Sequence, residues 1–170
     1  MILFLDFDGV LHGEPCMAED ALCRLPLVEE ILIDFPQVQI AVSSAWRLDW
    51  PDEAMAVAGL QQHFSVSLRN RLVRVTPDFR QIDPKGAPDG SGAYLRDWEC
   101  MDWMRKNKPA GVSYLMLDDR NWWFRPDHQY SMIVDGNNGF LRENEAELRA
   151  RLKGSASKTT KMEVHHDHTL

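Results

Sequence analysis

The 170-residue sequence lacks an excess of positive charge, and it has no long apolar run. Its 19 Lys and Arg residues face 26 Asp and Glu residues, giving a net charge of −7, the opposite of the overall basic footprint of nucleic-acid-binding proteins. A membrane-spanning helix needs about 20 predominantly apolar residues, and no such run occurs. We therefore expect no membrane span, and the acidic balance argues mildly against a polynucleotide partner, although a local basic patch is compatible with it.

Cysteine is scarce as well. Cys16, Cys23 and Cys100 are odd in number and do not show metal-ligand spacing, so we expect free thiols that serve as small packing residues. The N-terminus lacks a basic segment ahead of its apolar run, and two aspartates interrupt that run, which is unlike a secretory signal peptide. These features predict a cytoplasmic protein.

Short apolar segments alternate with segments of helical periodicity along most of the chain. The expected strands are residues 2–5, 38–42, 71–75, 112–117 and 130–134, and the expected helices are 26–35, 51–58, 94–108 and 143–153. This alternation predicts a three-layer α/β domain with a mostly parallel five-stranded sheet. Residues 154–170 are polar and aperiodic, so we expect one domain over residues 1–153 and a polar tail after it.

Polar side chains follow three of these strands where each strand ends: Asp6 and Asp8, Ser43 and Ser44, and Asp118 and Asp119. In a parallel sheet, ligands bind beyond the carboxyl ends of the strands. We therefore expect these side chains to meet at one edge. Acidic turns are common after strands, but three polar strand ends at the same edge favour a functional site.

Carboxylates gathered at one edge repel one another unless a cation lies among them. Oxygen ligands without nearby histidine or cysteine suit Mg²⁺, and a carboxylate is also a known nucleophile in phosphoryl transfer. Asp8, two residues after Asp6 on extended backbone, would lie on the same side and exchange a proton with the leaving oxygen and the attacking water.

The motifs resemble those of the haloacid dehalogenase-like (HAD) superfamily of phosphohydrolases. Leu5-Asp-Phe-Asp-Gly-Val-Leu11 is similar to its first motif, Val42-Ser-Ser44 to the second, and Tyr114-Leu-Met-Leu-Asp-Asp119 to the fourth. Arg96 fits the third motif best, with Lys85 as a rival. The chain is most similar to a small bacterial branch related to the HAD domain of multidomain RNA-repair proteins.

The resemblance implies a Rossmann-like fold and a role for each matching residue. Asp6 would become a phosphoaspartate, and Asp8 would act as general acid/base, with its backbone carbonyl reaching the metal. Asp119 would bind Mg²⁺ directly, with Asp118 behind it or as an alternate ligand. Substrate phosphate would meet Ser44, which we favour over Ser43, together with Arg96. Arg47 is a further phosphate candidate, with a plain surface arginine as the alternative.

The predicted function is that of a Mg²⁺-dependent phosphate monoester hydrolase. Both gaps in which this superfamily inserts lid domains are short here, which predicts a minimal cap and an open site for a phosphorylated substrate of undefined size. The alternatives are a phosphatase acting on nucleic-acid ends, or a non-catalytic module that binds Mg²⁺ and a phosphorylated ligand. Neither the substrate's identity nor the oligomeric state follows from the sequence.

Other chemistry-bearing residues receive simpler interpretations. We expect His12 in a solvated loop, with contact to substrate as the alternative, and Trp98 and Trp103 in the core. Packing over the sheet edge is the first interpretation of the aromatic run from Trp122 to Phe124, and stacking on an aromatic substrate is the alternative. The histidines of the tail, at positions 165, 166 and 168, are expected to belong to a polar segment without a fold, and a transition-metal site is the alternative.

Overall fold

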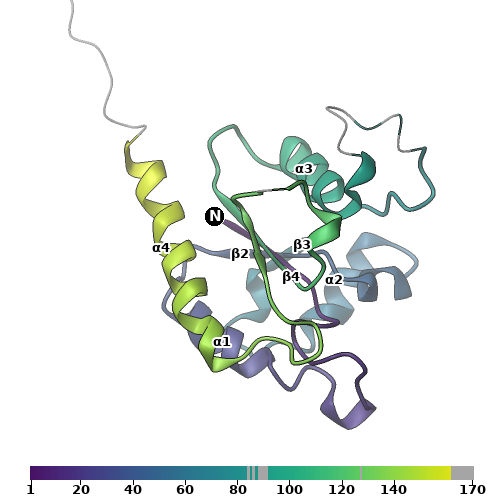
Figure 1. Cartoon of the computed structure of the whole chain (residues 1–170), viewed down its shortest axis with the longest axis vertical. Helices are drawn as coiled ribbons and strands as arrows, with labels where there is room; N and C mark the ends of the chain where they lie inside the picture. Colours follow the sequence, from purple (N-terminus) through teal and green to yellow (C-terminus); the bar gives the residue numbers. More distant parts are fainter. Residues whose placement is uncertain (84, 86, 88–91, 127, 162–170) are drawn as a thin grey trace, which may run out of the picture.

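In the computed structural model, which describes residues 1–83, 85, 87, 92–126 and 128–161, five strands form one sheet (Figure 1). They are β1 Ile2–Leu5, β2 Gln39–Val42, β3 Leu72–Val75, β4 Tyr114–Asp118 and β5 Ser131–Ile133. The strand order is β3-β2-β1-β4-β5, and every neighbouring pair is parallel. The predicted α/β class is confirmed, and the sheet is parallel throughout.

Strand β1 lies at the centre of the sheet and ends in register with its two neighbours, β2 and β4. Its last residue, Leu5, pairs with Val42 of β2 and with Leu117 of β4. The backbone ladder continues one step further, because the Asp6 N–H donates to the Leu117 carbonyl and the Ser43 N–H donates to the Leu5 carbonyl, both at 3.0 Å. The polar residues that follow the three strands therefore begin at the same level.

Helices cover both faces of the sheet. They are α1 Leu25–Ile33, α2 Glu53–Gln61, α3 Leu95–Asn107 and α4 Glu145–Lys161. Leu3 and Leu5 of β1 face a core shared with α1, α2 and α4, whereas Phe4 faces a second core that includes Trp103 of α3. Side chains of a strand alternate between the two faces, so α3 forms one outer layer and the other three helices form the opposite one (Figure 1).

Two helices extend beyond their expected ends. Helix α2 passes through Gly59 to Gln61, and α4 continues through Gly154 to Lys161 instead of ending at Lys153. A glycine inside a helix costs about 1 kcal/mol relative to alanine but does not by itself end the helix, and no proline follows either position closely. Residues 154–161, expected in the tail, are therefore helical, whereas residues 162–170 with their three histidines lie outside the described residues.

No separate lid domain interrupts the described part of the chain. Between β1 and α1 the only regular element is a short 3₁₀ helix, Ala18–Asp20. Between β2 and α3 the described residues add α2, β3 and short 3₁₀ turns, and β3 is part of the sheet. The cap is minimal, as predicted. None of the described helices combines the length and apolar character that a membrane span requires.

Candidate active site

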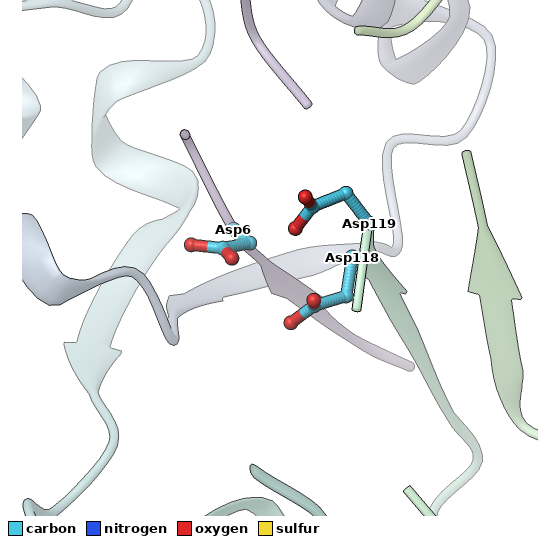
Figure 2. Close-up of side chains that lie close together, drawn as sticks. All are labelled: Asp6, Asp118 and Asp119. Atoms are coloured by element: carbon cyan, nitrogen blue, oxygen red, sulfur yellow. The ribbon is translucent and has the colours of Figure 1, made fainter. Parts of the chain in front are cut away.

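Three carboxylates, Asp6, Asp118 and Asp119, form an acidic cluster at the carboxyl ends of β1 and β4. Each offers an oxygen that lies within 4.8 Å of the others (Figure 2). Asp6 and Asp118 are buried, and Asp119 is partly buried. The convergence expected from the sequence is therefore present, since adjacent parallel strands end here in register.

Backbone groups and two glycines fix the orientation of the cluster. Asp6 Oδ1 accepts the Phe7 N–H, and Asp118 Oδ1 accepts the Arg120 N–H, each at 2.9 Å. A β-carbon at Gly9 would lie 2.5 Å from Asp119 Oδ2, and one at Gly136 only 2.4 Å from the same oxygen. Gly9 also has a positive φ of 69°, which favours glycine. These two positions therefore leave room for the Asp119 carboxylate.

Burial disfavours three negative charges in this cluster. It raises the pKa of Asp118 to about 7, with a further contribution from Asp6 and partial opposition from Arg96. Burial also raises the pKa values of Asp6 and Asp119. A carboxylate that loses its hydration keeps its charge only where other charges or donors compensate. The cluster therefore calls for more positive charge than the described side chains supply.

The donor set fits a hard divalent cation. Among the described residues, buried Asp118 Oδ2 and Asp119 Oδ1 have no hydrogen-bond partner, which is unusual for buried polar atoms. The ligands are all oxygens, as magnesium and calcium prefer. Asp6 and Asp119, with Asp118 beside them, are the residues that would hold such an ion.

Ser44, rather than Ser43, presents its hydroxyl to the acidic cluster. Its hydroxyl adjoins the Asp6 carboxylate and opposes the rise in the pKa of that group that burial causes. Ser44 also caps the 3₁₀ helix Ala45–Asp49, where the Trp46 N–H lies 3.4 Å from Ser44 Oγ. The bonds found for Ser43 are made by its backbone. The geometry favours Ser44 as the second-motif residue.

Arg96 is the cation nearest to the acidic cluster. Its Nε lies 3.3 Å from Asp118 Oδ2, and its Nη2 lies 3.8 Å from Asp6 Oδ2. The Nε contact lacks hydrogen-bond geometry. Although burial lowers the pKa of Arg96, Asp6 and the neighbouring carboxylates raise it overall. Its rival Lys85 is exposed, and its backbone N–H donates to Asp83, so the geometry favours Arg96 as the third-motif cation.

Arg47 has a structural position that differs from the expected contact with substrate phosphate. Its five N–H groups match five acceptors, which are the carbonyls of Ser43, Ser44, Thr76 and Pro77 and the carboxylate of Glu99. We call Arg47, Glu99 and these carbonyls the arginine network. The side chain is buried, so neither the substrate-binding prediction nor the surface alternative describes this residue. Its hydrogen-bonding capacity is used within the protein.

The Asp8 carboxylate contacts two side chains, those of Trp46 and His12, and neither contact was predicted from the sequence. Trp46 Nε1 donates to Asp8 Oδ1 at 2.8 Å, and His12 Nε2 lies 3.2 Å from the same oxygen. His12 is only 3% exposed, so the prediction of a solvated loop histidine is wrong. The four-residue spacing from Asp8 across the glycine turn was the available signal.

The aromatic residues after Asp119 fall into three environments. Trp122 is 65% exposed, and Phe124 is buried in the core of α3. The Trp123 ring packs against two guanidinium groups, with Arg96 at 4.8 Å and Arg120 at 4.6 Å from its centroid. Trp98 and Trp103 are buried, as predicted. Packing therefore explains Phe124, whereas Trp122 remains available for stacking.

Comparison with known families agrees with this geometry. The family model described as the HAD domain in Swiss Army Knife RNA repair proteins matches residues 2–145. This range includes the five strands, the acidic cluster, Asp8, Ser44 and Arg96. Comparisons with curated proteins and with solved structures gave no match.

Proposed function

The chain belongs to the family of HAD domains found in Swiss Army Knife RNA repair proteins, and on this basis we propose that it is a Mg²⁺-dependent phosphate monoester hydrolase. The observation that carries the proposal is the acidic cluster, in which Asp6, Asp118 and Asp119 converge within 4.8 Å. Ser44 and Arg96 adjoin the same carboxylates. A nucleophile, an anion-binding hydroxyl and a cation are thus available around one point.

Asp6 acts as the nucleophile in the proposed reaction. Its carboxylate oxygen forms a bond to phosphorus while the bond from phosphorus to the leaving oxygen breaks, and Asp8 gives that oxygen a proton. Water then attacks the phosphoaspartate, Asp8 takes the proton of the water, and phosphate leaves with Asp6 restored. The net reaction consumes one water molecule, releases the alcohol and inorganic phosphate, and involves no change of oxidation state.

Substrate phosphate is held by two groups beside the nucleophile. The Ser44 hydroxyl donates to one phosphate oxygen, and Arg96 supplies positive charge to others. Asp6, Asp119, Asp118 and the backbone carbonyl of Asp8 would hold Mg²⁺. When bound, the ion neutralises the carboxylates and the transferring group, so that an anionic nucleophile approaches an anionic substrate.

A phosphatase acting on nucleic-acid ends is the second candidate. The family's description refers to RNA repair proteins, and exposed Trp122 lies three residues after Asp119 in a position to stack on a base. The net charge of −7 weighs against a long polynucleotide. A non-catalytic binding module is less well supported, because both Asp6 and Asp8 are present.

A screen of phosphate monoesters tests the proposal. Purified protein with Mg²⁺ is offered nucleotides, phosphosugars, phosphopeptides, and oligonucleotides with a 3′- or 5′-phosphate. We expect hydrolysis of at least one class, and a loss on the order of 10⁴-fold or more in Asp6→Asn, as for other catalytic nucleophiles. Hydrolysis of none of them, or an active Asp6→Asn protein, would contradict the proposal. Preference for the oligonucleotides would favour the second candidate.

A further inference from the structure

We propose that His12 and Trp46 are positioning residues that hold Asp8 by its Oδ1 oxygen, so that Oδ2 alone exchanges the proton with substrate. This inference rests on the proposed hydrolase function and adds how its general acid is oriented. Trp46 Nε1 lies 2.8 Å and His12 Nε2 lies 3.2 Å from Oδ1. Neither side chain needs to touch the phosphate to affect the reaction.

The hydrogen bond on the other side of the His12 ring fixes the tautomer. The Leu22 N–H donates to His12 Nδ1 at 3.3 Å. A ring nitrogen that accepts a hydrogen bond carries a lone pair, so the ring hydrogen lies on Nε2, which faces Asp8. Leu22 has a φ of 61°, a left-handed conformation that is unfavourable for a large side chain. The chain thus maintains a costly backbone conformation at the residue that orients His12.

Surrounding contacts hold both donors in place. The Trp46 ring packs edge-on against Phe7, with centroids 5.4 Å apart, and the His12 ring lies 6.1 Å from Trp46. The loop is hydrogen-bonded on both sides of His12, since the Phe140 N–H donates to the Val10 carbonyl and the Glu14 N–H donates to the Gly136 carbonyl. His12 is therefore part of a packed loop, and Trp46 belongs to the 3₁₀ helix Ala45–Asp49.

The two contacts make the oxygens of Asp8 unequal. Oδ1 faces two N–H groups, whose hydrogens leave no favourable place for an acidic proton on that atom. Oδ2 makes no hydrogen bond to the described residues, and the Asp8 side chain is 29% exposed. The proton therefore resides on Oδ2 when Asp8 is the acid. In the first half-reaction it passes from Oδ2 to the leaving oxygen as the bond to phosphorus breaks, and in the second it returns from water.

The dependence of rate on the leaving group separates this role from a structural one. An alkyl phosphate needs a proton on its leaving oxygen, whereas p-nitrophenolate leaves without one. The parameter to compare is kcat/KM, because it covers the steps up to formation of the phosphoaspartate. For His12→Leu and Trp46→Phe, we expect kcat/KM to fall about 10- to 100-fold with an alkyl phosphate such as glycerol phosphate, part of what general acid catalysis supplies. With p-nitrophenyl phosphate we expect a change below about 3-fold.

Two further variants complete the test. His12→Gln keeps an N–H donor near the position of Nε2, and we expect it to restore most of the alkyl phosphate activity. His63→Asn is the matched control, because His63 is exposed and packs against Trp46 with ring centroids 5.7 Å apart. It makes no contact with Asp8 that the structure shows, so it should leave both substrates unaffected.

Each outcome decides between the roles. Equal losses with both esters, or no loss with the alkyl phosphate, would overturn the positioning role, while the proposed hydrolase function would stand. A wild-type protein that hydrolyses neither ester would overturn the proposed function and this inference with it. Thermal unfolding checks that each variant is folded. If His12→Leu does not fold, Trp46→Phe, which keeps the aromatic packing, decides alone.

Discussion

The arginine network and the acidic cluster share one edge of the sheet, but they differ in how their polar atoms are paired. In the arginine network, five N–H groups of Arg47 meet five acceptors, and Glu99 additionally accepts the Phe79 N–H at 3.0 Å. In the acidic cluster, buried Asp118 Oδ2 and Asp119 Oδ1 have no hydrogen-bond partner among the described residues. Those two oxygens meet positive charge only as ion pairs without hydrogen-bond geometry, with Arg96 Nε at 3.3 Å and Arg120 Nε at 3.7 Å, so only the arginine network is fully hydrogen-bonded.

This difference separates a structural charge from a functional one. Buried polar groups are normally satisfied, because an unpaired one loses its hydration without compensation. The arginine network obeys this rule and so serves to connect β2, the segment after β3 and α3. The acidic cluster departs from it, and burial raises the pKa of Asp118 to about 7. The acidic cluster is therefore where we expect a bound cation and, beside it, the phosphate of a substrate.

The largest predicted effect on stability is at Arg47. Arg47→Met removes five hydrogen bonds and the closer of the two arginines that pair with buried Glu99, leaving Arg96 at 3.4 Å, so the free energy of unfolding should fall by about 3 kcal/mol, the lower end for broken buried ion pairs. Urea unfolding measures this. The control is Arg149→Met, whose ion pairs with Asp34 and Glu145 are partly exposed and should contribute about 1 kcal/mol or less. Equal effects at the two sites would remove the contrast between the regions.

Mg²⁺ should stabilise the protein through the acidic cluster. Ligand at about 100 times its dissociation constant adds about 2.7 kcal/mol to the free energy of unfolding, which raises the Tm by several degrees. We expect this shift in wild type and its loss in Asp119→Asn, measured by thermal unfolding with Mg²⁺ or with EDTA. A shift that persists in Asp119→Asn would place the ion elsewhere.

Gly136 tests the space around the metal ligand. In Gly136→Ala the new β-carbon would lie 2.4 Å from Asp119 Oδ2, so the carboxylate must move. We expect the Kd for Mg²⁺ to rise about 10-fold, equivalent to about 1.4 kcal/mol, in calorimetric titration. Gly154→Ala is the control, since nothing lies within 4 Å of a β-carbon there. An unchanged Kd in Gly136→Ala would show that Asp119 does not bind the ion in this orientation.

The smallest effect concerns Asp118 and depends on pH. Its folded pKa of about 7 lies above the ordinary value of 3.8, so the folded state binds more protons between about pH 4 and pH 7. Its contribution to stability therefore falls as the pH rises through this range. In metal-free buffer, Asp118→Asn should match wild type at or below about pH 4, where Asp118 is protonated in both the folded and the unfolded state, and be more stable than wild type by on the order of 1 kcal/mol at pH 8. A variant less stable than wild type at pH 8 would contradict the account.

The fold and the acidic cluster followed from local signals, whereas the polar networks did not. Apolar runs predict the five strands, and the rule that parallel strands end at the same edge of a sheet predicts that Asp6 and Asp118 lie close together. The roles of Arg47 and His12 depend on carbonyls and carboxylates that are distant in sequence. Arg47, for example, bonds to Pro77 and Glu99. Residue type and spacing carry no information about such partners, so a buried arginine resembled a phosphate ligand and a buried histidine resembled a loop residue.

The end of α4 shows a similar limit. Gly154 resembled a stop signal, yet the helix continues to Lys161, because a glycine weakens a helix by an amount that neighbouring turns offset. Where a helix ends depends on several free-energy contributions of about 1 kcal/mol each, and the sequence alone does not show which of them is larger. The central strands were easier to predict because burial on both faces demands a continuous apolar run.

Trapping the phosphorylated protein tests the central claim most directly. Protein incubated with Mg²⁺ and p-nitrophenyl phosphate is quenched with acid, reduced with borohydride to convert an acyl phosphate to a stable alcohol, and digested for mass spectrometry. We predict that the peptide containing Asp6 carries the modification in wild type and that Asp6→Asn carries none. Turnover with modification at another residue, or turnover with no modification in rapid-quench samples, would contradict the assignment of Asp6 as the nucleophile.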